Sequence, residues 1–149
     1  MTLKIDSIDE RIVNELSKDS KMTLRRLAKK LGISAVTAMN RIKALEKEGI
    51  IRNYTIKVDY EKLGYGTHVI IEVKISKGKL FDLEKKIANS PNVYAVYDST
   101  GQFDATVIGR FKSTRAMDAF LKKIQTFDFV EGTHTKLVLN TIKEENIKL

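Results

Sequence analysis

One short stretch of this 149-residue sequence, SAVTAMNR, combines small side chains with side chains that form hydrogen bonds. Thr37, Asn40 and Arg41 can form hydrogen bonds with bases or phosphates. The methyl groups of Ala35 and Ala38 can contact the methyl group of thymine. A helix with this front can approach base edges in the major groove, whereas bulky or acidic side chains would hold it away. An ordinary surface helix with a solvated face is the alternative, and only the combination of this stretch with the helix caps, Gly32 and a basic preceding helix favours recognition of double-stranded DNA.

A basic helix is predicted just before this stretch. Its apolar residues recur at helical spacing, and its other side carries Arg25, Arg26, Lys29 and Lys30. In helix-turn-helix proteins the helix before the recognition helix crosses the DNA backbone, so we expect these four side chains to contact phosphates. The complete set of predicted DNA-contacting residues is Thr23, Arg25, Arg26, Lys29, Lys30, Ser34, Ala35, Thr37, Ala38, Asn40 and Arg41.

Three short helices must position these residues. Asp6, Thr23 and Ser34 are suitable N-cap residues for them, and Gly32 can end the second helix in the left-handed conformation. Helices joined by so few residues around a glycine must cross steeply. In the third helix we expect a buried stripe of apolar side chains, formed by Val36, Met39, Ile42 and Leu45.

The first domain is predicted to end in a wing and a hinge. After Gly49 the sequence alternates Tyr54, Ile56 and Val58 with polar residues, which predicts a short half-buried strand. The two glycines of EKLGYGT then indicate a linker. We expect a winged helix-turn-helix domain over residues 1–62 and a second domain over 63–149.

The second domain has the element order β-α-β-β-α-β, the ferredoxin-like arrangement of the α+β class. The predicted elements are a strand over 69–75, a helix over 80–88, strands over 93–99 and 105–111, a helix over 116–124 and a strand over 133–142. Both helices cover one sheet face, yet the strands carry apolar residues on both sides, such as Ile70 and Ile108. We expect the other face to pack against a second copy; a partly apolar exposed sheet is the alternative.

A turn in this domain could hold a free amino acid. The segment TGQFD offers Gly101, which permits close backbone approach, and Asp104, which could accept the ammonium group. Thr133 and Thr135 lie two positions apart on the last strand and could offer hydroxyls, while Tyr97 could form a wall. Ordinary turn and strand chemistry explains the same residues, so both interpretations remain open from the residues alone.

Composition excludes several classes of function. The chain has no Cys, and its only histidines, His68 and His134, are far apart, so we expect no metal and no cofactor. It carries none of the nucleophile, phosphate-loop or metal-ligand motifs of enzymes, and we predict that it is not an enzyme. The net charge of +8 favours an anionic partner. No apolar run is long enough to cross a membrane and no signal peptide is evident, so we expect a cytoplasmic protein.

The sequence resembles the Lrp/AsnC family, the leucine-responsive or feast/famine transcriptional regulators of bacteria and archaea. The matching segments are IDSIDERIVNELSKD, LAKKLGIS, RIKALEKEGII, DYEKLG, TGQFD and GTHTKLVL. The resemblance covers almost the whole chain. It implies dimers formed through the second domain, further assembly into octamers, and an amino-acid effector bound between sensing domains. It also implies roles for Gly101 and Asp104, which match the family's Gly-x-aromatic-Asp pattern.

Two other nucleic-acid-binding functions share features with this sequence. RNA-recognition motifs share the β-α-β-β-α-β order, but they need paired aromatic residues on the central strands, and here Phe103 and Phe111 lie at the ends of the third strand. An architectural protein that covers DNA without effector control remains the alternative to a regulator. Because only Asn40 and Arg41 are long enough for bidentate base contacts, we expect DNA shape and A·T-rich flanks to contribute much of the specificity.

Overall fold

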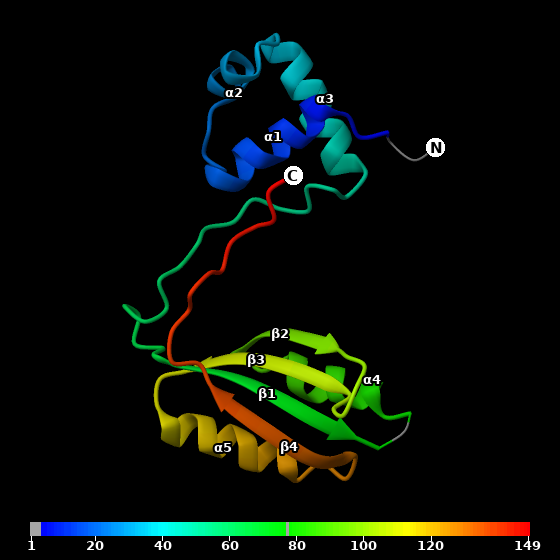
Figure 1. The fold of residues 1–149 in the computed structure, drawn as a ribbon, viewed down its shortest axis with the longest axis vertical. Helices are drawn as coiled ribbons and strands as arrows, with labels where there is room; N and C mark the ends of the chain where they lie inside the picture. The colour runs from blue at the N-terminus through cyan, green and yellow to red at the C-terminus, as the bar shows by residue number, and fades with distance from the viewer. Residues whose placement is uncertain (1–3, 77) are drawn as a thin grey trace. The chain divides into compact units, whose positions relative to one another are not determined.

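The computed structural model describes residues 4–76 and 78–149, which form two compact units (Figure 1). The first unit extends to Lys57 and also includes Lys143–Leu149. The second unit is Val58–Ile142. The chain therefore passes from the first unit to the second and then returns to the first.

Three helices make up most of the first unit: α1 (Ser7–Lys18), α2 (Leu24–Leu31) and α3 (Ala35–Lys47). Their apolar faces meet in one small core. The buried side chains of this core are Ile12, Leu16, Leu27, Leu31 and Leu45. Since none of these helices is long enough to be stable alone, packing of these faces provides most of their stability.

The predicted helix ends are confirmed. The Asp6 carboxylate accepts hydrogen bonds from the backbone N–H groups of Ile8 and Asp9 at the start of α1. Thr23 and Ser34 cap α2 and α3 in the same way. Gly32 closes α2 with φ of 71°, a left-handed conformation that favours glycine. These caps fix where α3 begins and therefore which residues its first turn presents.

The predicted wing strand is not formed. The residues from 52 to 59 are not assigned to a strand, and the Ile56 side chain is 71% exposed. Alternation of apolar residues favours an extended backbone, but a β-strand also needs a hydrogen-bonded neighbour. Tyr54 packs back on α3, where its hydroxyl donates to Glu46 Oε1 at 2.7 Å, and partial desolvation raises the pKa of Tyr54 to about 12.

The returning C-terminal segment is bonded to the first unit. The Asn14 side-chain amide donates to the Leu149 carbonyl at 2.7 Å, and the Leu149 N–H donates to Asn14 Oδ1 at 3.0 Å. The Lys57 ammonium also donates to the Glu144 carbonyl at 2.7 Å. Residues from both ends of the sequence therefore belong to one unit.

A four-stranded antiparallel sheet forms the second unit, in the strand order β2-β3-β1-β4 (Figure 1). This is the ferredoxin-like arrangement predicted from the sequence. The elements are β1 (Thr67–Ile75), α4 (Leu80–Leu83), η1 (Glu84–Ala88), β2 (Val93–Asp98), β3 (Ala105–Phe111), α5 (Thr114–Gln125) and β4 (Val130–Leu137). The predicted single helix over 80–88 is instead a short α-turn followed by a π-helical segment.

The last strand is also shifted from its predicted position. β4 begins at Val130 and ends at Leu137, whereas alternation had placed it over 133–142. Val138 still donates its N–H to the carbonyl of His68, but the following residues have passed the end of β1 and find no further strand to pair with in the described chain. Strand length is therefore set by the neighbour, not by the local pattern.

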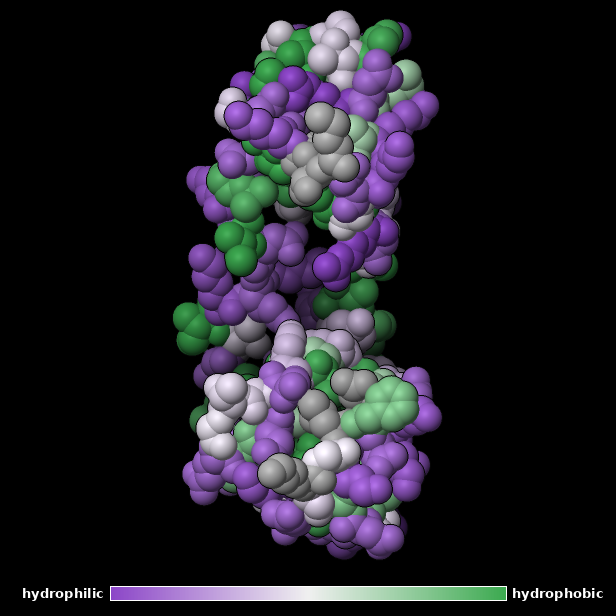
Figure 2. All heavy atoms as spheres, turned by 90° about the vertical axis from the view of Figure 1, so that its right-hand side faces the viewer, coloured by the Kyte–Doolittle hydropathy of each residue, from purple (hydrophilic) through white to green (hydrophobic). Residues whose placement is uncertain are grey.

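Among the described residues, helices cover one of the two sheet faces. Alternate residues of β1 and β3 are buried there against Leu83, Ile87 and Ile124. On the opposite face Ile70 and Ile108 form a cross-strand pair and are only partly buried. Figure 2 shows the molecule from the right-hand side of Figure 1, where the surface is mainly hydrophilic with hydrophobic residues scattered among the polar ones. Within the described part of the chain, no helix is both long and apolar enough to cross a membrane.

Candidate nucleic-acid interface and effector site

One side of α3 is exposed and carries little charge in its first two turns. Ala35, Val36, Thr37 and Asn40 are exposed there, and Lys43 continues the same side one turn later. No acidic residue occurs in the first turn of α3. The N-terminal end of a helix carries a partial positive charge, so this end favours an anionic partner such as DNA.

The sequence-based prediction is wrong at two positions of α3. Val36, expected in the buried stripe, is 63% exposed, and Ala38, expected on the exposed front, is completely buried. Successive residues of an α-helix are rotated by about 100°. Val36 therefore points away from Leu45, whereas Ala38 lies on nearly the same side as Leu45. A spacing of three residues drifts around the helix over several turns. Calculating the angle of each residue about the helix axis would have shown that Val36 is exposed and Ala38 is buried.

Arg41 is held by carboxylates of its own unit. Its Nη1 donates to both oxygens of Asp6 at 2.8 Å and to Oδ1 of Asp9 at 2.9 Å. Asp9 is buried, and the Arg41 side chain is only 29% exposed. The hydrogen bond from Arg41 is the main cause that lowers the pKa of Asp6, and the bond to Asp6 in turn raises the pKa of Arg41. The guanidinium expected to contact DNA thus joins the start of α1 to the middle of α3.

The basic side of α2 is exposed as predicted. Arg25, Arg26, Lys29 and Lys30 all lie at the surface. Two of them also approach carboxylates: an Arg26 Nη1 lies 3.6 Å from Asp19, and Lys30 forms an ion pair with Glu15. The remaining two, Arg25 and Lys29, have no ion pair within the described residues.

Three of the predicted DNA-contacting hydroxyls serve first as helix caps or partners of caps. Thr23 Oγ1 accepts the N–H of Arg26 at 3.3 Å. Ser34 Oγ accepts the N–H of Thr37 at 3.0 Å and lies 2.8 Å from the Thr37 hydroxyl. These bonds position the start of α2 and of α3.

Asp104 connects the turn before β3 to the end of β1. Its Oδ2 accepts the N–H of Ile75 at 2.8 Å and lies 3.4 Å from the Lys74 ammonium. The hydrogen bond from Ile75 is the main cause that lowers the pKa of Asp104. Gly101, three residues earlier, has φ of 120°, which a residue with a side chain rarely adopts. The carboxylate is therefore charged at neutral pH and partly exposed beside a glycine turn.

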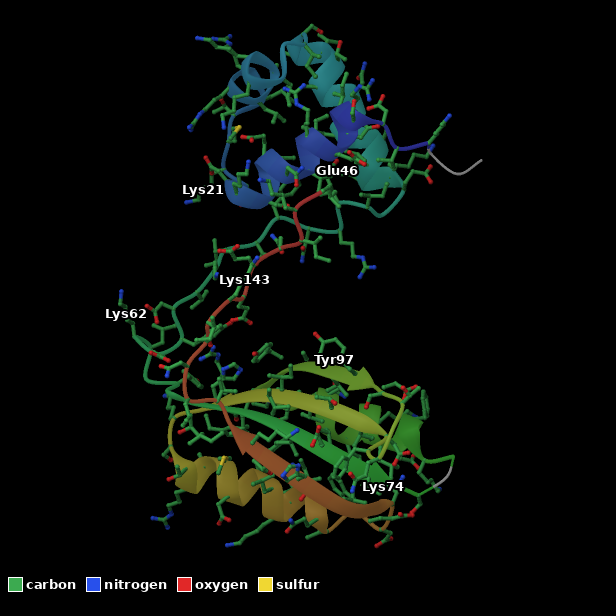
Figure 3. All side chains as sticks on the ribbon, in the orientation of Figure 1. Lys21, Glu46, Lys62, Lys74, Tyr97 and Lys143 are labelled. Atoms are coloured by element: carbon green, nitrogen blue, oxygen red, sulfur yellow. The ribbon has the colours of Figure 1, made fainter. Side chains whose placement is uncertain are left out.

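The other predicted effector residues lie on opposite faces of the sheet. Thr133 pairs with Val73 and Thr135 with Ile71, so both threonines lie on the helix-covered side. Gln125 of α5 donates to the Thr133 hydroxyl at 3.1 Å. Tyr97 is 56% exposed and projects from β2 on the side away from α5 (Figure 3). One sheet cannot bring Tyr97 and the two threonines to the same ligand.

Polar residues on the uncovered sheet face pair across strands. Glu72 of β1 accepts from His134 Nδ1 and from the Lys136 ammonium of β4, each at 2.9 Å. The hydrogen bond from Lys136 is the main cause that lowers the pKa of Glu72. The Phe103 ring stacks on His134 with ring centroids 5.9 Å apart. No group of three or more potential metal ligands was found among the described residues.

Comparison with known proteins identifies relatives of both units. Residues 5–52 match the winged helix-turn-helix DNA-binding family, and residues 68–147 match the Lrp/AsnC ligand binding domain. An uncharacterised HTH-type transcriptional regulator of Pyrococcus furiosus is 41% identical over 143 residues, which cover 96% of this chain and 97% of that protein. The HTH-type transcriptional regulator FL11 of the same organism is 36% identical and covers 94% of this chain and 93% of its own length.

Solved structures show the same fold. The structure of E. coli AsnC has a TM-score of 0.91 and 27% sequence identity, with 99% of this chain and 100% of that chain covered. A transcriptional regulator of Neisseria meningitidis, crystallised as a complex with L-Met, has a TM-score of 0.92 and 25% identity, with 98% of this chain and 96% of that chain covered.

Proposed function

Because the chain belongs to the Lrp/AsnC family of transcriptional regulators, we propose that it binds preferred DNA sequences through α3 and adjusts this binding to an amino-acid effector. The protein is a DNA-binding transcriptional regulator with a ligand-binding domain, and its family comprises regulators, not enzymes. The observation that carries the proposal is the exposed, nearly uncharged front of α3 directly after a helix with four exposed cations.

In the proposed complex α3 enters the major groove and α2 crosses the phosphate backbone. Arg25 and Lys29 are the best candidates for phosphate contacts, because neither forms an ion pair with another described side chain. Asn40 is the long side chain on the exposed front that can form a bidentate contact with adenine. Direct readout is then sparse, and the shape of A·T-rich flanks provides further specificity.

The proposed effector is an amino acid held near the 99–104 turn. Asp104 accepts its ammonium group, and N–H groups of the turn around Gly101 receive its carboxylate. The family match to a ligand-binding domain supports a ligand in this unit, and the L-Met complex of the Neisseria relative supports an amino acid as its class. Tyr97 and the pair Thr133 and Thr135 lie on opposite sheet faces, so all three contribute to one site only if different copies of the chain supply them.

The uncovered face of the same sheet is the proposed surface for self-association. Exposed Tyr94 and Tyr97 lie on the uncovered side together with Ile70 and Ile108. A second copy packed on this face would bury that apolar area, and we propose a homodimer formed in this way. Octamers, formed from such dimers, would bring effector sites of neighbouring dimers together.

Fluorescence anisotropy of labelled duplexes tests the proposal. The full chain is titrated onto random and A·T-rich duplexes over a salt series, without and with each common amino acid. A steep fall of affinity with salt, about 0.9 in log units per neutralised phosphate, a preference for some sequences and a shift with one amino acid are expected. Steep binding with neither preference nor shift would favour an architectural protein, and absence of binding at low salt would refute the role of α3.

A further inference from the structure

Val36 is an exposed aliphatic side chain at the place where a recognition helix meets base edges. It is the second residue of α3 and is 63% exposed. The N-terminal residues of a recognition helix are those that contact bases. Single exposed apolar residues are common on protein surfaces, so exposure alone assigns no role. The neighbours of Val36 provide the further argument.

Two of the polar side chains in the first two turns of α3 are already engaged within the protein. The Thr37 hydroxyl lies 2.8 Å from that of Ser34, and Arg41 donates to Asp6 and Asp9. Apart from Asn40, the exposed front of the first two turns therefore presents mainly methyl groups. This surface is complementary to an apolar group in the groove.

Only one base offers such a group. In the major groove thymine presents its C5-methyl group, whereas the other three bases present donors and acceptors alone. We propose that Val36 is a specificity-determining residue that recognises thymine through this methyl group. The inference rests on the proposed binding of α3 in the major groove and names the base that the helix selects.

Replacing thymine by uracil tests the contact, because uracil lacks the C5-methyl group but pairs identically. Duplexes are first selected from a random library with the full chain, and the best one is synthesised with dT or with dU. Its affinity is measured for the wild type and for Val36→Ala. Alanine favours an exposed helix more than valine does, so the variant is expected to fold.

Combining the base change from dT to dU with the substitution Val36→Ala in a double-mutant cycle gives the decisive result. For the wild type, the change from dT to dU should weaken binding about fourfold per half-site, the value for one buried methyl-sized group (about 0.8 kcal/mol). Val36→Ala should bind the dT duplex that much more weakly, and the change to dU should then cost clearly less than it costs the wild type, because only the smaller methyl groups of alanine remain on this side of α3. Ile56→Ala is the control, since Ile56 is 71% exposed in the same unit but is not part of α3, and it should retain the full loss with dU.

The outcomes separate this inference from the proposed function. If the wild type is indifferent to dU, or if Val36→Ala keeps the full loss, the role of Val36 is overturned while DNA binding stands. If no sequence is enriched from the library, sequence-specific recognition fails and the role of Val36 fails with it.

Discussion

In the first unit Asp6, Thr23 and Ser34 hold the ends of helices, whereas in the second unit Glu72 and Asp104 tie neighbouring strands together. The first arrangement fixes the ends of three short helices and leaves one side of α3 exposed to a partner. The second fixes a sheet whose candidate ligand groups are divided between two faces. A site on one helix can be complete in one chain, but a site divided between sheet faces needs a second copy.

The largest expected effect tests whether the two units are separate in stability. Leu27→Ala removes a fully buried side chain from the small core of the first unit and should cost about 2–5 kcal/mol of its unfolding free energy. Ile71→Ala is the matched change in the second unit. Urea unfolding followed by circular dichroism should show each variant weakening a different transition. Equal weakening of one common transition would contradict the division.

The next effect concerns the effector. Asp104→Asn keeps an oxygen that can accept the N–H of Ile75 but removes the negative charge proposed for the ammonium group. The affinity for the amino acid should fall by about tenfold or more, the cost of losing a hydrogen bond to a charged group. Calorimetric titration measures this affinity, and DNA binding without effector should be unchanged. Asp104→Ala is the comparison, because it also removes the bond to Ile75. An unchanged affinity in Asp104→Asn would exclude Asp104 from the site.

A smaller effect distinguishes contact from positioning in the first unit. Arg25→Ala should reduce the slope of log affinity against log salt by about 0.9 for a lost phosphate contact. Arg41→Ala should weaken binding with little change in slope, because its guanidinium is already paired with Asp6 and Asp9. Anisotropy titrations over a salt series measure both. An equal reduction of slope for the two variants would make Arg41 a phosphate contact.

The smallest expected effect is on acid stability. Ion pairs with Lys18 and Lys30 lower the pKa of Glu15 from 4.5 to about 2. A carboxylate with a lowered pKa stabilises the folded state above its unfolded pKa, and this contribution is lost as the pH falls from about 4.5 to 2. Urea midpoints of the first unit should fall over this range. Glu15→Gln should reduce the dependence on pH, and an unchanged profile would show that the ion pairs add nothing.

The sequence predicted the features that depend on local chemistry. Asp6, Thr23, Ser34 and Gly32 stand at the helix ends because capping needs only a side chain and the next few residues. The β-α-β-β-α-β order could also be predicted, because the periodicity of hydrophobic residues within each segment indicates whether it is a helix or a strand.

Features that depend on residues distant in the sequence were not predicted. The strand expected over 54–58 lacks a hydrogen-bonded neighbour, and β4 ends where β1 no longer runs beside it. The faces of Tyr97 and Thr133 follow from strand register, which alternation within one strand does not define. The irregular pairing of β2 between Val93 and Ala95 shifts that register further. The ion pairs of Arg41 join residues more than 30 positions apart, a proximity that no local motif encodes.

The bonds between Asn14 and Leu149 have a consequence for protein synthesis. The second unit is, in the order of translation, an insertion within the first. The ribosome synthesises α1 to α3 early, yet residues 143–149 of the same unit emerge only after the whole sheet has been made. The hydrogen bonds between Asn14 and Leu149 can therefore form only after the roughly 85 residues of the second unit have been synthesised.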